Sequence, residues 1–493
     1  MKRREFVASS LALAVSAYST RARAAASGDL PILSRTGKQL ILTGAEVSEL
    51  RSGLQGSLLL SGDDGYEQAR HIWNGAFDRH PAAIVRCKDA ADVVNAVQIA
   101  GTHDLLVAVR GGGHSLPGHS VCEGGLMIDL APMQGVQVDA KLRTVRVDPG
   151  VWLGTMDRAV QKAGFIVPAG TVSHTGVAGL SLGGGTGRLA RKFGLSIDNL
   201  LGANLVTPDG KLRKVNAQEN PDLFWAIRGG GGNFGVVTSF EFGLHELRSD
   251  VIGGDLVFPI AQARGMLDFL ADFAVRAPDE LWMDPVLECD AQGNRQLMLN
   301  VCHCGTAKDA QKDIEALRKA GKTTRDNVGA RPFVTLQSEH DGDSPRGRGY
   351  YMNGAGVLKL EPALLDHALR SIQQPGAELG KVSLTQTGGA IARVGADATA
   401  FANRTAPFNV VVRASWEEPG KAAERTAWQK ATWKGFEPFA RGIYANLNLA
   451  PDADAKLVAA YGLNMKRLVD LKTQYDPTNL FHLNPNIPPR PAA

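Results

Sequence analysis

Cysteine is scarce in this chain, which has five cysteines among 493 residues, scattered between positions 87 and 304. An odd and scattered set does not form the kind of disulfide framework that holds small secreted domains together. The one cluster is Cys302-His303-Cys304, whose two sulfur atoms would share one face of a strand and supply half of a zinc site. No second pair lies at a usual zinc-site spacing, so we interpret the segment as part of an ordinary strand and expect no metal site.

The sequence also lacks an excess of charge of one sign. Its formal net charge of +4 comes from the beginning of the chain. The first 26 residues contain one acid, Glu5, and five basic residues: Lys2, Arg3, Arg4, Arg21 and Arg23. Nucleic-acid-binding proteins need a surface dense in Lys and Arg, so we do not expect nucleic acid as a partner.

The apolar stretch near the N-terminus is too short to cross a bilayer. It runs from residue 6 to residue 17 and is diluted by three serines, whereas a stable membrane-spanning helix needs about 20 residues. The stretch follows Arg3-Arg4 and precedes Ala-Arg-Ala-Ala-Ala at 22–26. This pattern is typical of a cleavable bacterial twin-arginine export signal. We therefore predict a signal peptide at 1–26, a periplasmic or secreted mature protein, and no membrane association after signal removal.

After the predicted signal peptide, two regions differ in their pattern of strands, helices and glycines. In the region 61–248, short apolar strands alternate with glycine-rich turns. The expected strands lie within 105–113, 124–130, 143–150 and 200–210. Segments 89–103 and 153–164 have helical spacing, with Asp89 or Asp92 and Thr155 or Asp157 available as caps near their starts.

In the region 249–444 the glycine-rich turns become rarer. Expected strands at 295–304, 380–389 and 408–416 alternate with expected helices at 261–277 and 362–374. Strands with one polar face usually form an antiparallel sheet, and a sheet with a free face can serve as the wall of a substrate pocket. The remaining segment, 445–493, contains an expected helix at 456–476 and is predicted to pack back on the first region.

Glycine is abundant, with 56 residues, and four loops hold much of it: 110–115, 168–171, 179–187 and 228–235. Glycine allows a positive φ and a close approach of the backbone to a ligand, and consecutive N–H groups can then hold phosphate oxygens. Neither the Rossmann pattern nor the P-loop pattern is present. Four such loops in one region indicate a bound dinucleotide of another class.

His114 follows three glycines at the end of an expected strand. Most histidines in a chain of this size have structural roles. The glycines remove neighbouring side chains here, so the imidazole would lie against whatever the loop surrounds. This position favours a ligand-facing role.

Long motifs in these regions resemble those of FAD-linked oxidases with a PCMH-type FAD-binding domain, the berberine-bridge-enzyme-like group that includes 6-hydroxynicotine and oligosaccharide oxidases. The motifs occur in the family's order: VRGGGHS, PAGTVSHTGVAGLSLGGGTG, NPDLFWAIRGGGGNFGVVTSFEF and YGLNMKRLVDLKTQYDPTNLF. The resemblance covers about 66–247 and 444–487. It implies an α+β fold with a two-subdomain FAD-binding domain at 61–248 and a substrate domain at 249–444, whose antiparallel sheet is backed by helices. The C-terminal segment, 445–493, would complete the FAD domain.

The resemblance further implies that FAD is bound covalently through His114. Many members have a second link through a cysteine, but Val172 occupies that position here, so we expect a single link. The histidine that often follows the next glycines is Leu180 in this chain. A covalent imidazolyl substituent should hold the flavin through export and raise its reduction potential, which would favour hydride removal from poor donors.

The resemblance also identifies residues expected around the cofactor. Pyrophosphate contacts are expected from the backbone N–H groups of Gly111, Gly112, Gly113 and Ser115. The other expected contacts lie in the same loops or at matching motif positions: Arg110, Gly118, His119, Gly170, Thr171, Gly176, Gly179, Gly183, Gly184, Val237, Tyr461 and Asn464.

The implied activity is oxidation of a small molecule at a carbon bearing OH or N, with O₂ as electron acceptor and H₂O₂ as product. Tyr444, in a Tyr-Ala-Asn segment, is the first candidate for the catalytic base, and Gln386 or the pair Tyr350-Tyr351 are candidates for facing the substrate. A sugar or secondary alcohol is favoured because export places the enzyme among extracellular carbohydrates. The alternatives are an amine or alkaloid oxidase, a dehydrogenase with another acceptor, and a flavin-binding protein without turnover.

Overall fold

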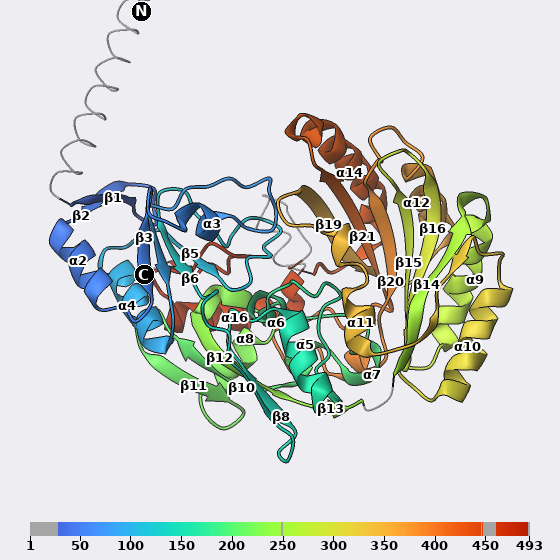
Figure 1. Cartoon of the computed structure of the whole chain (residues 1–493), viewed down its shortest axis with the longest axis horizontal. Helices are drawn as coiled ribbons and strands as arrows, with labels where there is room; N and C mark the ends of the chain where they lie inside the picture. Colours follow the sequence, from blue (N-terminus) through green and yellow to red (C-terminus); the bar gives the residue numbers. More distant parts are fainter. Residues whose placement is uncertain (1–27, 248–249, 445, 447–459, 492–493) are drawn as a thin grey trace, which may run out of the picture.

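The computed structural model describes residues 28–247, 250–444, 446 and 460–491. The expected signal peptide at 1–26 lies outside these residues. The structure is a mixed α+β fold with two lobes, one built from the N- and C-terminal parts of the chain and one from its middle (Figure 1). Within the described residues, no helix is both long and apolar enough to span a membrane.

The first subdomain is built on a four-stranded sheet with the order β3-β4-β6-β5. Its strands are β3 (Ser57–Leu60), β4 (Ala83–Arg86), β6 (Leu126–Asp129) and β5 (Val107–Arg110). Strand β6 pairs in parallel with both β4 and β5. Helix α4 (Ala90–Thr102) packs on this sheet, and the carboxylate of Asp89 caps it, as expected. Because β5 ends at Arg110, the chain enters the first glycine loop directly from the sheet.

The second subdomain is built on an antiparallel five-stranded sheet with the order β11-β10-β12-β8-β7. Its strands are β7 (Val136–Asp139), β8 (Thr144–Val147), β10 (Leu200–Val206), β11 (Leu212–Asn216) and β12 (Val236–Gly243). The helices α5 (Leu153–Lys162), α6 (Val177–Leu182) and α8 (Pro221–Ile227) share its apolar core. Trp152 is the N-cap of α5 and makes no side-chain cap bond, so the expectation of a Thr155 or Asp157 cap was wrong.

The middle region, 250–444, forms a nine-stranded antiparallel sheet, as expected. The central strands are β14 (Val251–Pro259), β16 (Arg295–His303), β15 (Leu281–Cys289), β20 (Lys381–Gln386), β21 (Phe408–Trp416) and β19 (Gly349–Val357), in that order across the sheet. Short strands β17 (Arg325–Asp326), β18 (Gly329–Arg331) and β22 (Ala440–Arg441) pair at its edges. The Cys302-His303 segment belongs to β16, in agreement with its interpretation as a strand.

Helices cover one face of this sheet. They are α9 (Ala263–Arg276), α10 (Ala307–Lys319), α12 (Pro362–Ser371) and α14 (Ala422–Phe436) (Figure 1). Their apolar side chains share one core with alternate residues of the strands, such as Val382, Leu384, Val410 and Val412. The residues between these point to the other face, which looks towards the glycine loops.

The C-terminal segment packs on the first lobe. Helix α16 (Met465–Tyr475) follows a short 3₁₀ turn, and positions 456–459 of the expected helix lie outside the described residues. The fully buried Lys472 Nζ donates to the carbonyls of Asn233 (2.8 Å) and Phe481 (3.0 Å). Phe481 packs in the core of the first subdomain and α16 in that of the second, so the segment joins the two.

Candidate active site

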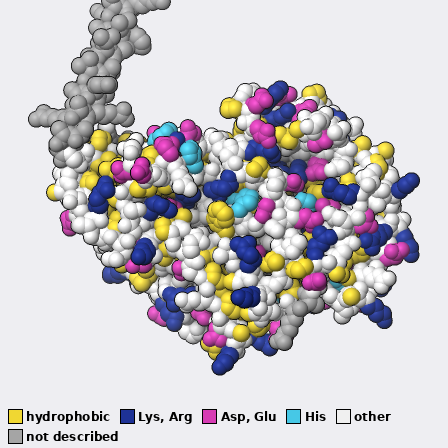
Figure 2. Space-filling view, viewed as in Figure 1, with side chains coloured by type: hydrophobic (Ala, Val, Ile, Leu, Met, Phe, Trp, Pro, Cys, Tyr) yellow, Lys and Arg dark blue, Asp and Glu magenta, His cyan; other side chains and the backbone are white. Residues whose placement is uncertain are grey.

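A cavity of about 520 Å³ lies between the glycine loops and the uncovered face of the nine-stranded sheet. This volume is typical of small-molecule sites. One wall is made by residues of the segments 111–120, 170–188 and 231–237, and the other by β15, β16, β20, β21 and the loop 340–344. Figure 2 shows the surface hollowed between the two lobes, with charged and histidine side chains around the hollow.

Glycine is required where two of the loops meet. A Cβ on Gly112 would lie 2.6 Å from the backbone N of Gly176, so the loops touch through their backbones. Gly179, Gly231 and Gly232 line the cavity, and a Cβ on any of them would enter open space. The loops therefore form a cradle whose floor is bare backbone.

His114 faces this cradle from the end of the first loop. Its ring stacks on Trp73, and Trp73 stacks on Tyr350 with centroids 3.9 Å apart. Burial, with the nearby charges of His174 and Arg346, lowers the pKa of His114 to about 3. The imidazole is therefore neutral near pH 7, and its Nε2 has no hydrogen-bond partner among the described residues.

Other polar atoms at the cavity wall are also left without partners. His119 Nδ1, Ser120 Oγ and Asn484 Oδ1 are buried, line the cavity and meet no hydrogen-bonding group in the described part of the chain. Buried polar atoms are nearly always paired. The bare backbone, the neutral His114 and these unpaired atoms fit a large polar ligand such as a dinucleotide.

Most of the expected cofactor residues share this cavity. Those that line it are Gly111, Gly112, Gly113, His114, Ser115, His119, Gly170, Thr171, Gly176, Gly179 and Val237. Val172 and Leu180, the positions that differ from the family pattern, line it too.

Six expected cofactor residues do not line the cavity, and their role towards a cofactor stays a prediction. Arg110 is the last residue of β5, and its Nε lies 3.8 Å from Asp129 Oδ1 on the neighbouring strand β6. The other five are Gly118, beside Phe77; Gly183 and Gly184, beside Asn446 and Tyr444; and Tyr461 and Asn464, which are buried. Asn464 Nδ2 donates to the carbonyls of Ala396 (2.7 Å) and Thr399 (3.1 Å), which explains its burial.

Tyr444 lies on the cavity wall, where sequence reasoning placed a catalytic group. Its hydroxyl oxygen accepts hydrogen bonds from the backbone N–H of Gly185 (3.0 Å) and from Asn446 Nδ2 (3.1 Å). Burial raises the pKa of Tyr444 above its ordinary value. The residue is therefore a protonated phenol at neutral pH.

Gln386 lies away from the cavity, so the expectation that it faces a substrate was wrong. Side chains alternate along β20, and Ser383 and Thr385 take the cavity face. Gln386 instead turns towards the helices, where its Nε2 donates to the carbonyl of Ala274 on α9 (2.8 Å). Tyr350 and Tyr351 are also absent from the cavity wall, since Tyr350 lies behind Trp73.

The sheet face supplies a polar wall that sequence reasoning missed. One row across the strands consists of Asn300, Asp284, Thr385 and Asn409, and Thr385 Oγ1 donates to Asp284 Oδ1 (2.8 Å). Two residues further along each strand, the next row consists of the apolar side chains of Met298, Val286 and Val411 and the hydroxyl of Ser383. The next row contains Lys381 and Arg413. The sequence signal was weak, because on β15, β16 and β21 single polar residues alternate with apolar ones along the cavity face.

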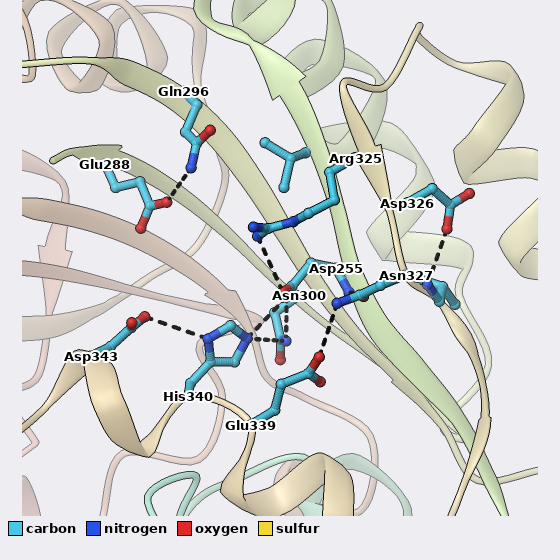
Figure 3. A network of polar contacts seen from close by, with 12 residues as sticks. Asp255, Glu288, Gln296, Asn300, Arg325, Asp326, Asn327, Glu339, His340 and Asp343 are labelled. Atoms are coloured by element: carbon cyan, nitrogen blue, oxygen red, sulfur yellow. Dashed lines mark hydrogen bonds and ion pairs between the residues drawn. The ribbon is translucent and has the colours of Figure 1, made fainter.

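A charged network supports this wall at its edge (Figure 3). His340 Nε2 lies 3.0 Å from Asp255 Oδ1, and His340 Nδ1 lies 3.4 Å from Asp343 Oδ2. Burial alone would lower the pKa of His340, but the two carboxylates outweigh it and raise the pKa to about 9. His340 is therefore an imidazolium at neutral pH, and its charge together with that of Lys381 holds the pKa of Asp343 well below its usual range.

Lys381 supplies a second positive charge next to the carboxylates of this network. Its Nζ lies 2.7 Å from Asp343 Oδ2 and 2.9 Å from Glu288 Oε2. Asn300 Nδ2 also donates to Asp255 Oδ1 (2.8 Å). The wall thus offers many donors and acceptors without a large net charge.

Comparisons with known proteins agree with this geometry. Residues 81–216 match the family described as FAD binding domain, and residues 445–488 match the family described as berberine and berberine like. The chain is 32% identical to an FAD-linked oxidoreductase of Dictyostelium discoideum over 90% of this chain and 97% of that protein. It is 30% identical to (R)-6-hydroxynicotine oxidase of Paenarthrobacter nicotinovorans over 88% and 97%. The crystal structure of 6-hydroxy-D-nicotine oxidase from Arthrobacter nicotinovorans superposes with a TM-score of 0.81 at 27% identity, covering 89% of this chain and 98% of that one.

Proposed function

The chain belongs to the berberine-bridge-enzyme-like family of FAD-linked oxidoreductases, and we propose that it is an oxidase acting on a C–OH or C–N carbon of a small molecule. The observation that carries the proposal is that one cavity joins a backbone cradle, a neutral His114 and a polar sheet wall. A flavin and a substrate would meet between the two walls. O₂ is the proposed electron acceptor.

The cradle residues have distinct proposed roles. The backbone N–H groups of Gly111 to Gly113 and of Ser115 would hold the pyrophosphate, and His114 would form the single covalent bond to the flavin, because Val172 cannot form a second. The partner-free Nε2 of a neutral imidazole supports this role. Bound FAD would accept a hydride and pass the electrons to O₂, giving H₂O₂.

The sheet wall favours a substrate rich in hydroxyl groups. Asn300, Thr385, Ser383 and Asn409 present neutral donors and acceptors to the cavity, and the charges of His340, Asp343 and Lys381 at its edge are paired. Hydrogen-bonding sites of this kind select substrates that satisfy every buried group. We therefore propose a sugar or secondary alcohol. Oxidation of an amine or alkaloid is the second candidate, because a relative with 30% identity is a 6-hydroxynicotine oxidase.

We also propose that the enzyme works outside the cytoplasm. The support is the twin-arginine pattern at 1–26. A cofactor bound covalently before export would stay with the protein in a compartment without free FAD.

Two measurements test the proposal. Acid precipitation of purified wild type and His114→Ala should leave yellow flavin only in the wild-type pellet, and flavin released from both would overturn the covalent link. Peroxide release is then followed with glucose, cellobiose, xylobiose, 2-butanol and 6-hydroxynicotine. Flavin bleached by one of these yet stable in air would mean a dehydrogenase, and no bleaching by any of them would mean that this substrate class is wrong.

A further inference from the structure

We propose that Asp284 is the catalytic base that takes the proton from the substrate hydroxyl, an inference that rests on the proposed oxidase function. Asp284 lies in the middle of β15, and its side chain points into the cavity from the sheet face opposite the glycine loops. It was not a candidate from sequence, because no motif surrounds it. Its position and its bonding set it apart from the other titratable groups of the cavity.

The first argument is the bonding of its carboxylate. Oδ1 accepts one hydrogen bond, from Thr385 Oγ1 on the neighbouring strand (2.8 Å). Within the described residues, Asp284 has no ion pair and no second donor, so Oδ2 is available to a ligand. Thr385 fixes the orientation of the carboxylate without occupying both oxygens.

The second argument is that the other groups of the wall are already committed. The carboxylate of Asp343 is held between His340 and Lys381. His340 is an imidazolium, and Tyr444 is a protonated phenol whose oxygen accepts two hydrogen bonds. Among the described residues that line the cavity, Asp284 is the one carboxylate outside an ion pair.

The third argument is the charge around Asp284. Burial raises its pKa to about 6, and Thr385 and the positive charges of Arg188, Lys381 and His340 limit the rise. Arg188 is itself buried: its Nη1 donates to Thr171 O and to Gln337 Oε1 (3.0 Å each), and its guanidinium lies over the ring of Trp282. Asp284 is thus mostly ionised at pH 7 and still basic enough to take a proton efficiently.

The proton transfer balances with the proposed oxidation. When the substrate C–H bond breaks, bound FAD would supply the acceptor for the hydrogen and its electron pair, which leave as hydride. The O–H electron pair becomes the second bond of the product C=O group, and the hydroxyl proton moves to Asp284. O₂, the proposed acceptor, would then take the two electrons together with the proton of the transferred hydride and one proton from water, giving H₂O₂, and Asp284 returns its proton to water.

The test is anaerobic stopped-flow reduction of the flavin in the holoenzyme by glucose, cellobiose, xylobiose and 2-butanol between pH 4.5 and 8.5. The wild-type rate should fall below about pH 6 as Asp284 becomes protonated. Asp284→Asn should reduce the rate about 10² to 10⁴-fold and remove this acid limb, and Asp284→Glu should recover part of the rate. Thr385→Val should move the limb to higher pH, because the carboxylate loses the hydrogen bond from Thr385.

The matched control is Asp272→Asn, on the exposed side of α9 and on the far face of the sheet. It should keep the wild-type rate and pH profile, and all variants should keep the wild-type flavin content and melting temperature. An Asp284→Asn enzyme with the wild-type rate and acid limb would overturn the role of Asp284 while leaving the oxidase function intact. A wild-type enzyme that none of these compounds reduces would overturn the proposed function itself.

Discussion

The imidazole of His114 lies flat against the indole of Trp73, with ring centroids 4.1 Å apart and planes inclined by 13°. The indole is anchored from behind, because Trp73 Nε1 donates to the carbonyl of Ser344 (2.8 Å) and Tyr350 stacks on its other side. Since Ser344 and Tyr350 belong to the middle region, the substrate lobe helps to orient the histidine of the cofactor lobe.

Trp73→Ala should therefore lower the fraction of protein with covalently attached flavin. The variant removes the ring that holds His114 and leaves a cavity in the core, with an expected loss of about 3 kcal/mol of stability. Trp73→Phe retains an aromatic face and should keep most of the attachment. The measurement is flavin fluorescence of the denatured protein in a gel, with melting temperatures recorded in parallel. Equal fluorescence of wild type and Trp73→Ala would contradict the orienting role.

Gly112→Ala should separate the two loops that meet at Gly176. The added Cβ would lie 2.6 Å from the Gly176 backbone N. This overlap is with backbone atoms, so relieving it requires one of the two loops to move. We expect poor flavin binding and a lower melting temperature, measured by absorbance and thermal unfolding. The control is Gly265→Ala in helix α9, where a Cβ meets no atom within 4 Å and the better helix propensity should raise stability by about 0.5 to 1 kcal/mol. Normal flavin content in Gly112→Ala would show that the loop contact is dispensable.

Stability should fall as the pH rises through the pKa of His340. Burial works against the charged form, but Asp255 and Asp343 raise the pKa to about 9 in the folded protein, while an unfolded histidine titrates near 6.5. The contribution is therefore complete below about pH 6.5 and is lost as the pH approaches 9. The size expected from linkage is about 3 kcal/mol.

The measurement is urea unfolding of wild type and His340→Gln at pH 6 and pH 9.5. The variant should be clearly less stable than wild type at pH 6, and the difference should shrink at pH 9.5. A constant difference at both pH values would mean that the charge of His340 does not contribute.

The glycine loops and His114 could be predicted from sequence because their signal is local. A run of glycines after a strand constrains the backbone within a few residues, and His114 follows directly from it. The polar wall could not be predicted, since Asp284, Asn300, Thr385 and Asn409 lie on four strands and meet only through sheet register. The wrong prediction for Gln386 has the same origin. Neighbouring residues of a strand point to opposite faces, and the sequence around Gln386 did not show which face of β20 the helices cover.

Lys472→Met should destabilise the protein and weaken flavin binding together. Lys472 is fully buried on α16, where its Nζ pairs with Asp476 Oδ2 (2.7 Å) and also donates to the carbonyls of Asn233 and Phe481. Removing one partner of a buried ion pair leaves an uncompensated charge, which typically costs about 3 to 5 kcal/mol. Because Phe481 and Asn484 of the following segment line the cavity, loosening this segment should also lower flavin content.

The control is Lys466→Met on the same helix, whose exposed side chain makes an i,i+4 pair with Asp470 and should contribute less than about 0.5 kcal/mol. Thermal unfolding and the flavin-to-protein absorbance ratio are measured for both variants, and a destabilised Lys472→Met protein with full flavin content would mean that the tail supports the fold without shaping the cavity.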